Sequence, residues 1–301
     1  MSAFHGLCAF PITPADPDGT VDAAALRGLV RRLVDAGVDS IGLLGTTGSY
    51  PYLSRAERRR AVEAAVGEAG GRVPVLVGVG ALRTDDAVRL AGDAKAAGAA
   101  AGLLAPVSYT PLTDDEVFEH VRAVAAASGL PLCLYNNPST THFTFGPALI
   151  GRLARVAGIV AAKDPAPPAA EAGARLAALR DAVPPGFPLG VSVDWHAAQA
   201  LLLGADAWYS VAAGLFPGPC VALARAAARR DRDEVRRRDA ELAPLWDLFR
   251  RHTSLRVMFA AAEALGLARA APPRPVLPLG DDARRAVALV AAELEDRSAR
   301  A

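Results

Sequence analysis

The stretch Gly158-Ile159-Val160-Ala161-Ala162-Lys163-Asp164-Pro165 is almost wholly apolar until it reaches a lysine, and a proline then stops it. Because Ile, Val and Ala follow one another without polar alternation, the stretch predicts a strand buried on both faces, as in a parallel sheet. The amine of Lys163 then lies at the carboxyl end of a buried strand, where barrel enzymes carry catalytic groups. Burial disfavours a charged ammonium, and a neutral lysine amine is a nucleophile.

Lysine is rare in this chain. Among the 33 lysines and arginines, only Lys95 and Lys163 are lysines, so arginine supplies nearly every cation. Arginine cannot form an imine with a ketone, whereas a neutral lysine amine can. Lys95 lies in a polar helical stretch, whereas Lys163 lies in an apolar one. Lys163 is therefore a candidate nucleophile, and the alternative is a buried structural lysine that pairs with Asp164.

Short apolar stretches alternate with amphipathic ones along the first two thirds of the chain. Eight strands separated by helices predict an α/β fold, a (β/α)8 TIM barrel. The main alternative is an open doubly wound sheet, but no Gly-x-Gly-x-x-Gly follows the first strand. The predicted strands cover residues 7–12, 40–44, 73–79, 100–105, 130–135, 159–163, 188–192 and 207–211.

The strand pattern stops near Pro219. We therefore expect a catalytic barrel over residues 1–218 and a C-terminal three-helix extension over residues 219–301 that packs on it. A rigid connection, Pro272-Pro273-Arg274-Pro275, precedes the last helix. The predicted helices of this extension cover residues 219–250, 253–266 and 281–297.

The composition argues against several kinds of partner and site. A net charge of +1 gives no strong field that would attract nucleic acid or an anionic membrane. No uncharged apolar run reaches about 18 residues, and no signal-peptide pattern occurs, so we expect a cytoplasmic protein without a membrane span. Cys8, Cys133 and Cys220 are far apart, and the five histidines form no metal-binding motif, so we expect no disulfide framework and no metal.

Two polar turns follow predicted strands. Gly45-Thr46-Thr47-Gly48 follows the second strand, and its successive amides and hydroxyls suit a small anion such as a carboxylate. The alternative is an ordinary polar turn. Tyr135-Asn136-Asn137-Pro138 ends the fifth strand, where a tyrosine hydroxyl at the barrel mouth can relay a proton. The alternative is a core tyrosine. Asp194 and His196 follow the seventh strand, and we expect them to cap and pack a helix; the alternative is that they are ligands.

Together, the Gly-Thr-Thr-Gly turn, the Tyr-Asn-x-Pro motif and the lysine that ends the sixth strand resemble the dihydrodipicolinate synthase / N-acetylneuraminate lyase family. The resemblance covers nearly the whole chain. It implies a barrel with C-terminal helices, assembled as a homo-oligomer, a dimer or most often a homotetramer. It also implies class I aldolase chemistry on pyruvate or a related 2-oxo acid together with an aldehyde, and no cofactor beyond the covalent imine.

The resemblance also implies a role for each matching residue. Lys163 would form the Schiff base, Tyr135 would shuttle a proton with help from Thr46, and Thr47 with the neighbouring amides would hold the substrate carboxylate. A protonated imine is an electron sink that stabilises the carbanion at the adjacent carbon. The residues expected to bind substrate are Thr47, Gly48, Tyr209, Ser108, Tyr109 and Thr140.

Three positions depart from the family's synthase. Thr140 stands where the synthase has an arginine that binds the carboxylate of its second substrate. Ser108 stands where it has a relay tyrosine lent across a subunit interface, and Tyr109 is one residue away. Ser49 replaces the usual acidic residue after the Gly-Thr-Thr-Gly turn.

These departures argue for a different aldehyde partner or for a dehydratase reaction, and we therefore predict a Schiff-base aldolase or lyase whose aldehyde partner is not aspartate semialdehyde. One alternative is the 4-hydroxy-tetrahydrodipicolinate (dihydrodipicolinate) synthase of lysine biosynthesis. Another, from a different class, is a non-catalytic binding or regulatory relative. Intact Lys163, Tyr135 and Thr47 count against that third reading, because a binding protein does not need all three.

Overall fold

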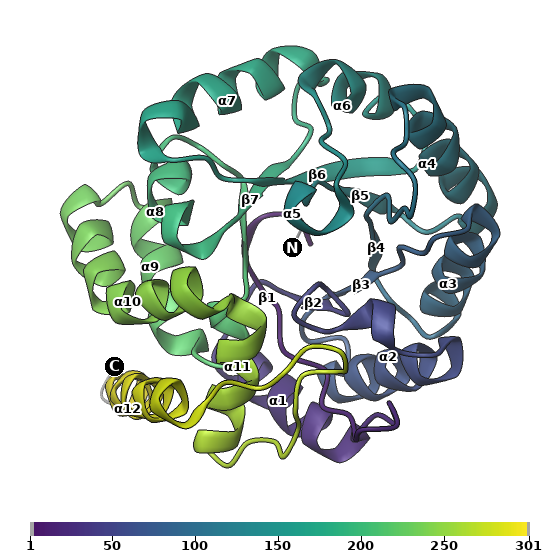
Figure 1. The fold of residues 1–301 in the computed structure, drawn as a ribbon. Helices are drawn as coiled ribbons and strands as arrows, with labels where there is room; N and C mark the ends of the chain where they lie inside the picture. The colour runs from purple at the N-terminus through teal and green to yellow at the C-terminus, as the bar shows by residue number, and fades with distance from the viewer. Residues whose placement is uncertain (1–2, 300–301) are drawn as a thin grey trace.

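A computed structural model describes residues 3–299 of the chain. Its eight parallel strands form one closed barrel in sequence order, in which β1 pairs with β8 (Figure 1). The predicted (β/α)8 fold is therefore confirmed. The strands are β1 (Gly6–Ala9), β2 (Ser40–Leu43), β3 (Val75–Gly78), β4 (Ala101–Leu104), β5 (Leu132–Tyr135), β6 (Ile159–Pro165), β7 (Leu189–Ser192) and β8 (Ala207–Ser210).

A ring of helices surrounds the strands, as Figure 1 shows. Local sequence accounts for where several of them begin. For example, α4 begins with a capping box. The Thr113 hydroxyl accepts a hydrogen bond from the backbone amide of Glu116, and the Glu116 carboxylate accepts one from the backbone amide of Thr113. The helices of the ring are α1 (Ala23–Asp35), α2 (Arg55–Ala69), α3 (Thr84–Ala96), α4 (Asp114–Ser128), α6 (Pro147–Leu153), α7 (Ala169–Ala182), α8 (Asp194–Leu202) and α9 (Pro217–Ala228). Shorter helices η1 (Tyr50–Tyr52), α5 (Pro138–Thr141) and η2 (Ala212–Gly214) lie in loops after strands.

The C-terminal part differs from the prediction at one point. The single helix expected over residues 219–250 is two helices, α9 and α10 (Arg232–His252). The break has a local cause, because Arg230 has a positive φ of 58° and the side chain of Asp231 caps α10 at the amide of Glu234. α9 packs on α8 and β1, and α10 packs on α8 and α9. The helices α10, α11 (Ser254–Ala264) and α12 (Asp281–Ala299) also pack on one another. The division of the chain at residue 218 stays a prediction.

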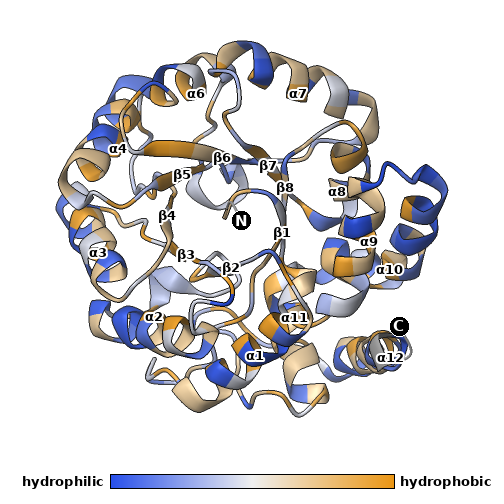
Figure 2. Cartoon of the chain, turned by 180° about the vertical axis from the view of Figure 1, so that it is seen from behind, coloured by the Kyte–Doolittle hydropathy of each residue, from blue (hydrophilic) through white to orange (hydrophobic). Residues whose placement is uncertain are grey.

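Two apolar layers make the core. The larger one lies between strands and helices, and the smaller one fills the barrel with Phe10, Tyr209, Cys8 and Cys133 among its members. The interior is so close-packed that a Cβ on Gly42 would lie 2.2 Å from the Phe10 ring. The strands in Figure 2 are mostly orange or white, whereas the outer helices alternate between orange and blue. Among residues 3–299, no helix has the length and apolar character needed to cross a membrane.

Candidate active site

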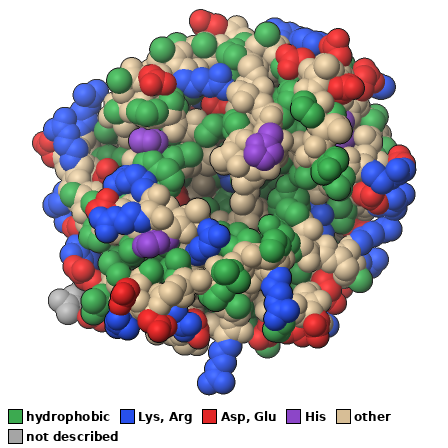
Figure 3. Space-filling model, viewed as in Figure 1, with side chains coloured by type: hydrophobic (Ala, Val, Ile, Leu, Met, Phe, Trp, Pro, Cys, Tyr) green, Lys and Arg blue, Asp and Glu red, His purple; other side chains and the backbone are tan. Residues whose placement is uncertain are grey.

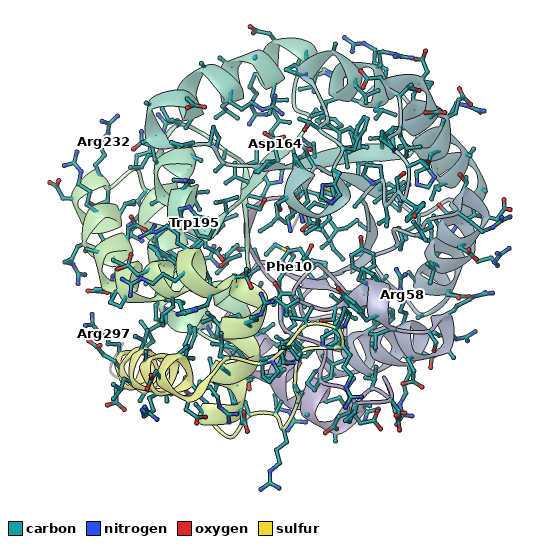
Figure 4. The ribbon with its side chains drawn as sticks, in the orientation of Figure 1. Phe10, Arg58, Asp164, Trp195, Arg232 and Arg297 are labelled. Atoms are coloured by element: carbon teal, nitrogen blue, oxygen red, sulfur yellow. The ribbon has the colours of Figure 1, made fainter. Side chains whose placement is uncertain are left out.

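Strand β6 brings Lys163 into the barrel interior. Its side chain is only 3% exposed, and its Nζ lies 3.9 Å from the centre of the Phe10 ring and 4.1 Å from that of Tyr135. The Tyr209 ring lies 5.5 Å from the same atom. No described residue forms an ion pair or hydrogen bond with this amine. Figure 4 places Phe10 near the middle of the barrel, and Figure 3 shows a hollow there bordered by hydrophobic side chains.

Asp164 does not pair with Lys163. Consecutive residues of a strand point to opposite faces. Lys163 points into the barrel towards the rings of Phe10 and Tyr135, and Asp164, labelled in Figure 4, points towards the helices. There the Asp164 carboxylate accepts two hydrogen bonds from Arg175 of α7, at 2.9 and 2.8 Å. The predicted alternative of a structural Lys163–Asp164 pair is therefore wrong, and the amine is left without a charged partner.

Asp164 belongs to a buried network that joins the ends of β5 and β6. The side-chain amide of Asn136 donates to Asp164 at 2.6 Å, and its oxygen accepts the Phe145 amide at 3.1 Å. The backbone amide of Asn136 donates to the carbonyl of Lys163 at 2.9 Å. This network holds Tyr135, the last residue of β5, beside Lys163.

Two predicted site residues meet directly beside the lysine. The hydroxyls of Thr46 and Tyr135 lie 3.0 Å apart, although 89 residues separate them in the chain. The side-chain nitrogen of Asn137 donates to both, to Thr46 at 3.0 Å and to Tyr135 at 3.1 Å. The prediction that Thr46 assists Tyr135 therefore has the required geometry.

The turn after β2 keeps backbone amides free. Thr47 is buried, and the backbone amides of Thr46, Thr47 and Gly48 form no hydrogen bond to any other described residue. A Cβ on Gly48 would lie 2.9 Å from the Leu44 Cα, so only glycine fits this turn. Free amides in a tight turn can bind an anion, as the sequence predicted for this turn.

The remaining predicted substrate ligands lie in different surroundings. Tyr209 is buried, and its hydroxyl lies 3.7 Å from the sulfur of Cys133; burial raises its pKa well above the usual value. Ser108 donates its hydroxyl to the carbonyl of Thr110 in its own loop. Tyr109 is 95% exposed and does not reach the Thr46–Tyr135 pair. The substrate contacts of Tyr209, Ser108 and Tyr109 stay predictions.

Thr140 lies in α5 and donates its hydroxyl to the backbone carbonyl of Asn137. Arg152 does not supply a cation in its place, because it pairs with Asp115 at 2.8 Å and lies over the Phe118 ring on the outside of the barrel. The role of Thr140 in substrate binding stays a prediction, and the helix α5 itself carries no arginine.

Other predicted features have structural roles. Asp194 accepts hydrogen bonds from the Trp208 indole at 2.8 Å and from the amides of Val211 and Ala212, so it ties the start of α8 to the end of β8. Burial raises its pKa. Among residues 3–299, no group of three or more His, Cys, Asp or Glu side chains could hold a metal ion.

The sequence analysis missed several residues of the site. Asn137 was quoted only as part of a motif, and Phe10 only as part of an early strand. Asn136 appeared only as the asparagine of the Tyr-Asn-x-Pro motif, and Arg175 had no signal, because an arginine in a helix ordinarily faces solvent. A strand period of two, applied to Lys163 and Asp164, would have separated these two side chains.

Comparisons with known proteins agree over almost the whole chain. The sequence model of the dihydrodipicolinate synthetase family matches residues 3–294. The 4-hydroxy-tetrahydrodipicolinate synthase of Methylococcus capsulatus is 37% identical over 276 residues, which are 91% of this chain and 93% of the relative.

Solved structures agree with these relatives. The crystal structure of dihydrodipicolinate synthase from Agrobacterium tumefaciens superposes with a TM-score of 0.95 at 52% identity, and covers 97% of this chain and 98% of its own. The enzyme from Acinetobacter baumannii, whose crystal structure is a complex with pyruvate, has a TM-score of 0.88 at 29% identity, with 97% and 99% covered.

Proposed function

The chain belongs to the dihydrodipicolinate synthetase family, and from this premise we propose that Lys163 is the residue through which it forms a Schiff base with pyruvate. The protein is a carbon–carbon lyase of the class I aldolase type. The observation that carries the assignment to Lys163 is its buried amine, which has three aromatic rings around it and no charged partner among the described residues. Because no ion pair with a described residue holds this amine, it is free to attack the carbonyl carbon of a ketone.

The surrounding groups support each step of this chemistry. The amine adds to the C2 carbonyl of the 2-oxo acid, and loss of water leaves a protonated imine. The free amides of Thr47 and Gly48 hold the carboxylate of the substrate. Tyr135, paired with Thr46, gives its hydroxyl hydrogen to the group that leaves as water. The tyrosinate that remains takes a proton from C3, and the imine receives the electron pair to form an enamine. The C3 carbon of the enamine then attacks an aldehyde carbonyl, whose oxygen takes up a proton.

The identity of the aldehyde has two candidates. The relative from Methylococcus capsulatus is named a 4-hydroxy-tetrahydrodipicolinate synthase, which favours aspartate semialdehyde and the lysine-biosynthetic alternative. The relatives reported above give no support to a different partner. One observation favours the second candidate, a neutral aldehyde: the loop of α5 carries Thr140 and no arginine. A carboxylate in a partly dry site binds best to a guanidinium through two hydrogen bonds.

The first experiment tests the imine. Pyruvate and sodium borohydride should add a stable reduced adduct to the peptide that contains Lys163, and Lys163→Arg should lose both adduct and activity because arginine cannot form an imine. Lys95, in α3, is the internal control because it faces the outside of the barrel. An adduct on Lys95 alone would refute the assignment. No adduct with any of several 2-oxo acids would favour the non-catalytic alternative.

The second experiment identifies the aldehyde. The kcat/KM for aspartate semialdehyde is compared with that for a neutral aldehyde of the same length, at saturating pyruvate. A value of about 10⁴ M⁻¹s⁻¹ or more with aspartate semialdehyde would establish the synthase activity. Loss of a charge-assisted hydrogen bond costs about 1.5–3 kcal/mol, so preference for the neutral aldehyde by about 10- to 100-fold would establish the second candidate.

We also propose that the protein is a homo-oligomer. Loops after β2, β3 and β4 expose Tyr52 (45%), Leu82 (66%) and Tyr109 (95%), and the ends of adjacent parallel strands lie along one edge of the barrel. Large exposed side chains of this kind are typical of contacts between subunits. Light scattering of the parent and of Tyr109→Ser tests this; a monomeric parent would refute it.

A further inference from the structure

The side chain of Asn137 contacts both hydroxyls of the Thr46–Tyr135 pair beside Lys163. Its side-chain nitrogen lies 3.0 Å from the Thr46 oxygen and 3.1 Å from the Tyr135 oxygen, and these two oxygens are 3.0 Å apart. No other side chain among residues 3–299 forms a hydrogen bond to either hydroxyl. We propose that Asn137 is a positioning residue that keeps one hydroxyl hydrogen of this pair available to the substrate, an inference that rests on the proposed function.

The amide nitrogen of Asn137 can only donate hydrogen bonds. It carries two hydrogens and accepts none, so the oxygens of Thr46 and Tyr135 must both accept from Asn137. If Thr46 also donates to Tyr135, the phenol hydrogen of Tyr135 has no partner in the triangle and can point to the substrate. If Tyr135 donates instead, the Thr46 hydrogen is the free one. In both arrangements the pair retains one hydrogen for the reaction.

The position of Asn137 excludes a simpler explanation. It is the N-cap residue of α5, where an asparagine side chain usually accepts a hydrogen bond from an amide of the first turn. Its side chain forms no such bond, and only its backbone carbonyl accepts the amides of Thr140 and Thr141, both at 3.0 Å. The side chain therefore turns into the site instead of stabilising the helix.

A further contact holds the amide in this orientation. The hydroxyl of Ser139 donates to Oδ1 of Asn137 at 2.9 Å, which leaves the nitrogen of Asn137 to face Thr46 and Tyr135. Within the same subunit, the other polar residues proposed for this part of the site do not reach the pair, since Ser108 bonds within its own loop and Tyr109 is exposed. Asn137 thus supplies from within one subunit the donors that the pair receives.

The test uses a reaction that needs no aldehyde. Enamine formation exchanges the methyl hydrogens of pyruvate for deuterium in D2O, and NMR measures the rate at saturating pyruvate. Asn137→Asp keeps the shape of the side chain but replaces both donors with acceptors, so both hydroxyl hydrogens are drawn to the carboxylate. We expect exchange to fall about 10²-fold at pH 7.5, with the KM for pyruvate changed less than about threefold.

A pH profile separates positioning from a structural role. The introduced carboxyl can donate again when it is protonated. Exchange by Asn137→Asp, relative to the parent at the same pH, should therefore rise by about three- to eightfold between pH 7.5 and 5. Asn137→Val removes the donors without adding a charge, so its exchange should fall less, about tenfold, and show no recovery. Ser139→Ala is the loop control, and we expect it to change exchange less than Asn137→Val does.

The outcomes distinguish this inference from the proposed function. Equal losses in Asn137→Asp and Asn137→Val without recovery at low pH would overturn the positioning role, as would more than half of the parent rate in both. If Asn137→Asp does not fold, Asn137→Val alone decides, and a rate above half of the parent overturns the inference. A parent that neither exchanges nor traps pyruvate overturns the proposed function, and this inference with it.

Discussion

Replacement of Arg175 by methionine tests the network behind the catalytic strand. Arg175 donates two hydrogen bonds to Asp164 and a third, at 3.1 Å, to the carbonyl of Phe145. The Asp164 side chain is 5% exposed and that of Arg175 is 26% exposed. The hydrogen bonds to Asp164 also raise the pKa of Arg175. Arg175→Met would leave a buried carboxylate with Asn136 as its one side-chain donor.

The expected cost follows from this burial. Removal of one partner from a fully buried ion pair costs about 3–5 kcal/mol, and from an exposed pair about 1 kcal/mol or less. Because the guanidinium of Arg175 is partly exposed, we expect a loss of about 2–4 kcal/mol. For a chain of this size the Tm should fall by roughly 4–8 °C.

Urea unfolding followed by circular dichroism measures this loss. The matched control is the double variant Asp164→Asn with Arg175→Met, which removes both charges and should recover at least about 1 kcal/mol relative to Arg175→Met alone. A loss below about 0.5 kcal/mol in Arg175→Met, or a double variant no more stable than it, would refute the reasoning.

Three further predictions concern single side chains. Tyr135→Phe should slow deuterium exchange of pyruvate by about 10²–10⁴-fold without loss of the fold, because only a hydroxyl is removed; a rate within twofold of the parent would show that Tyr135 only packs. Thr140→Arg should raise kcat/KM for aspartate semialdehyde by at least about tenfold relative to a neutral aldehyde, because a guanidinium binds its carboxylate; an equal change for both aldehydes would contradict this. Burial lowers the pKa of His120, whose ring nitrogen lies 3.0 Å from the Thr84 hydroxyl. As the pH falls below about 6.5, this histidine is protonated more readily in the unfolded chain than in the folded one, so the free energy of unfolding decreases. His120→Gln should therefore lose less stability than the parent between pH 7.5 and 5.5, by up to about 1 kcal/mol in urea unfolding, and identical losses would contradict the argument.

The barrel could be predicted because its signals are local. Each strand is a short apolar run between helical stretches. Strands that are apolar on both faces occur mostly in parallel sheets that helices cover on both sides. The same locality placed Tyr135 at the end of β5 and Lys163 near the end of β6, which continues two residues beyond the predicted end, to Pro165. The break between α9 and α10 was missed because the charged residues around Arg230 continue a helical pattern, and a single positive φ interrupts it.

The sequence by itself therefore determined the alternation of strands and helices and the lysine at the barrel mouth, since both depend on neighbouring residues. Only the tertiary structure decided what surrounds that lysine. Phe10 comes from the segment after β1, Tyr135 from β5 and Tyr209 from β8, and closure of the barrel brings their rings around the amine. Asn137 turns from its helix towards Thr46, 91 residues away, because the turn after β2 lies beside the end of β5 at the same mouth. Such contacts depend on which strands are neighbours in space, and the pattern of residues within one strand does not specify this.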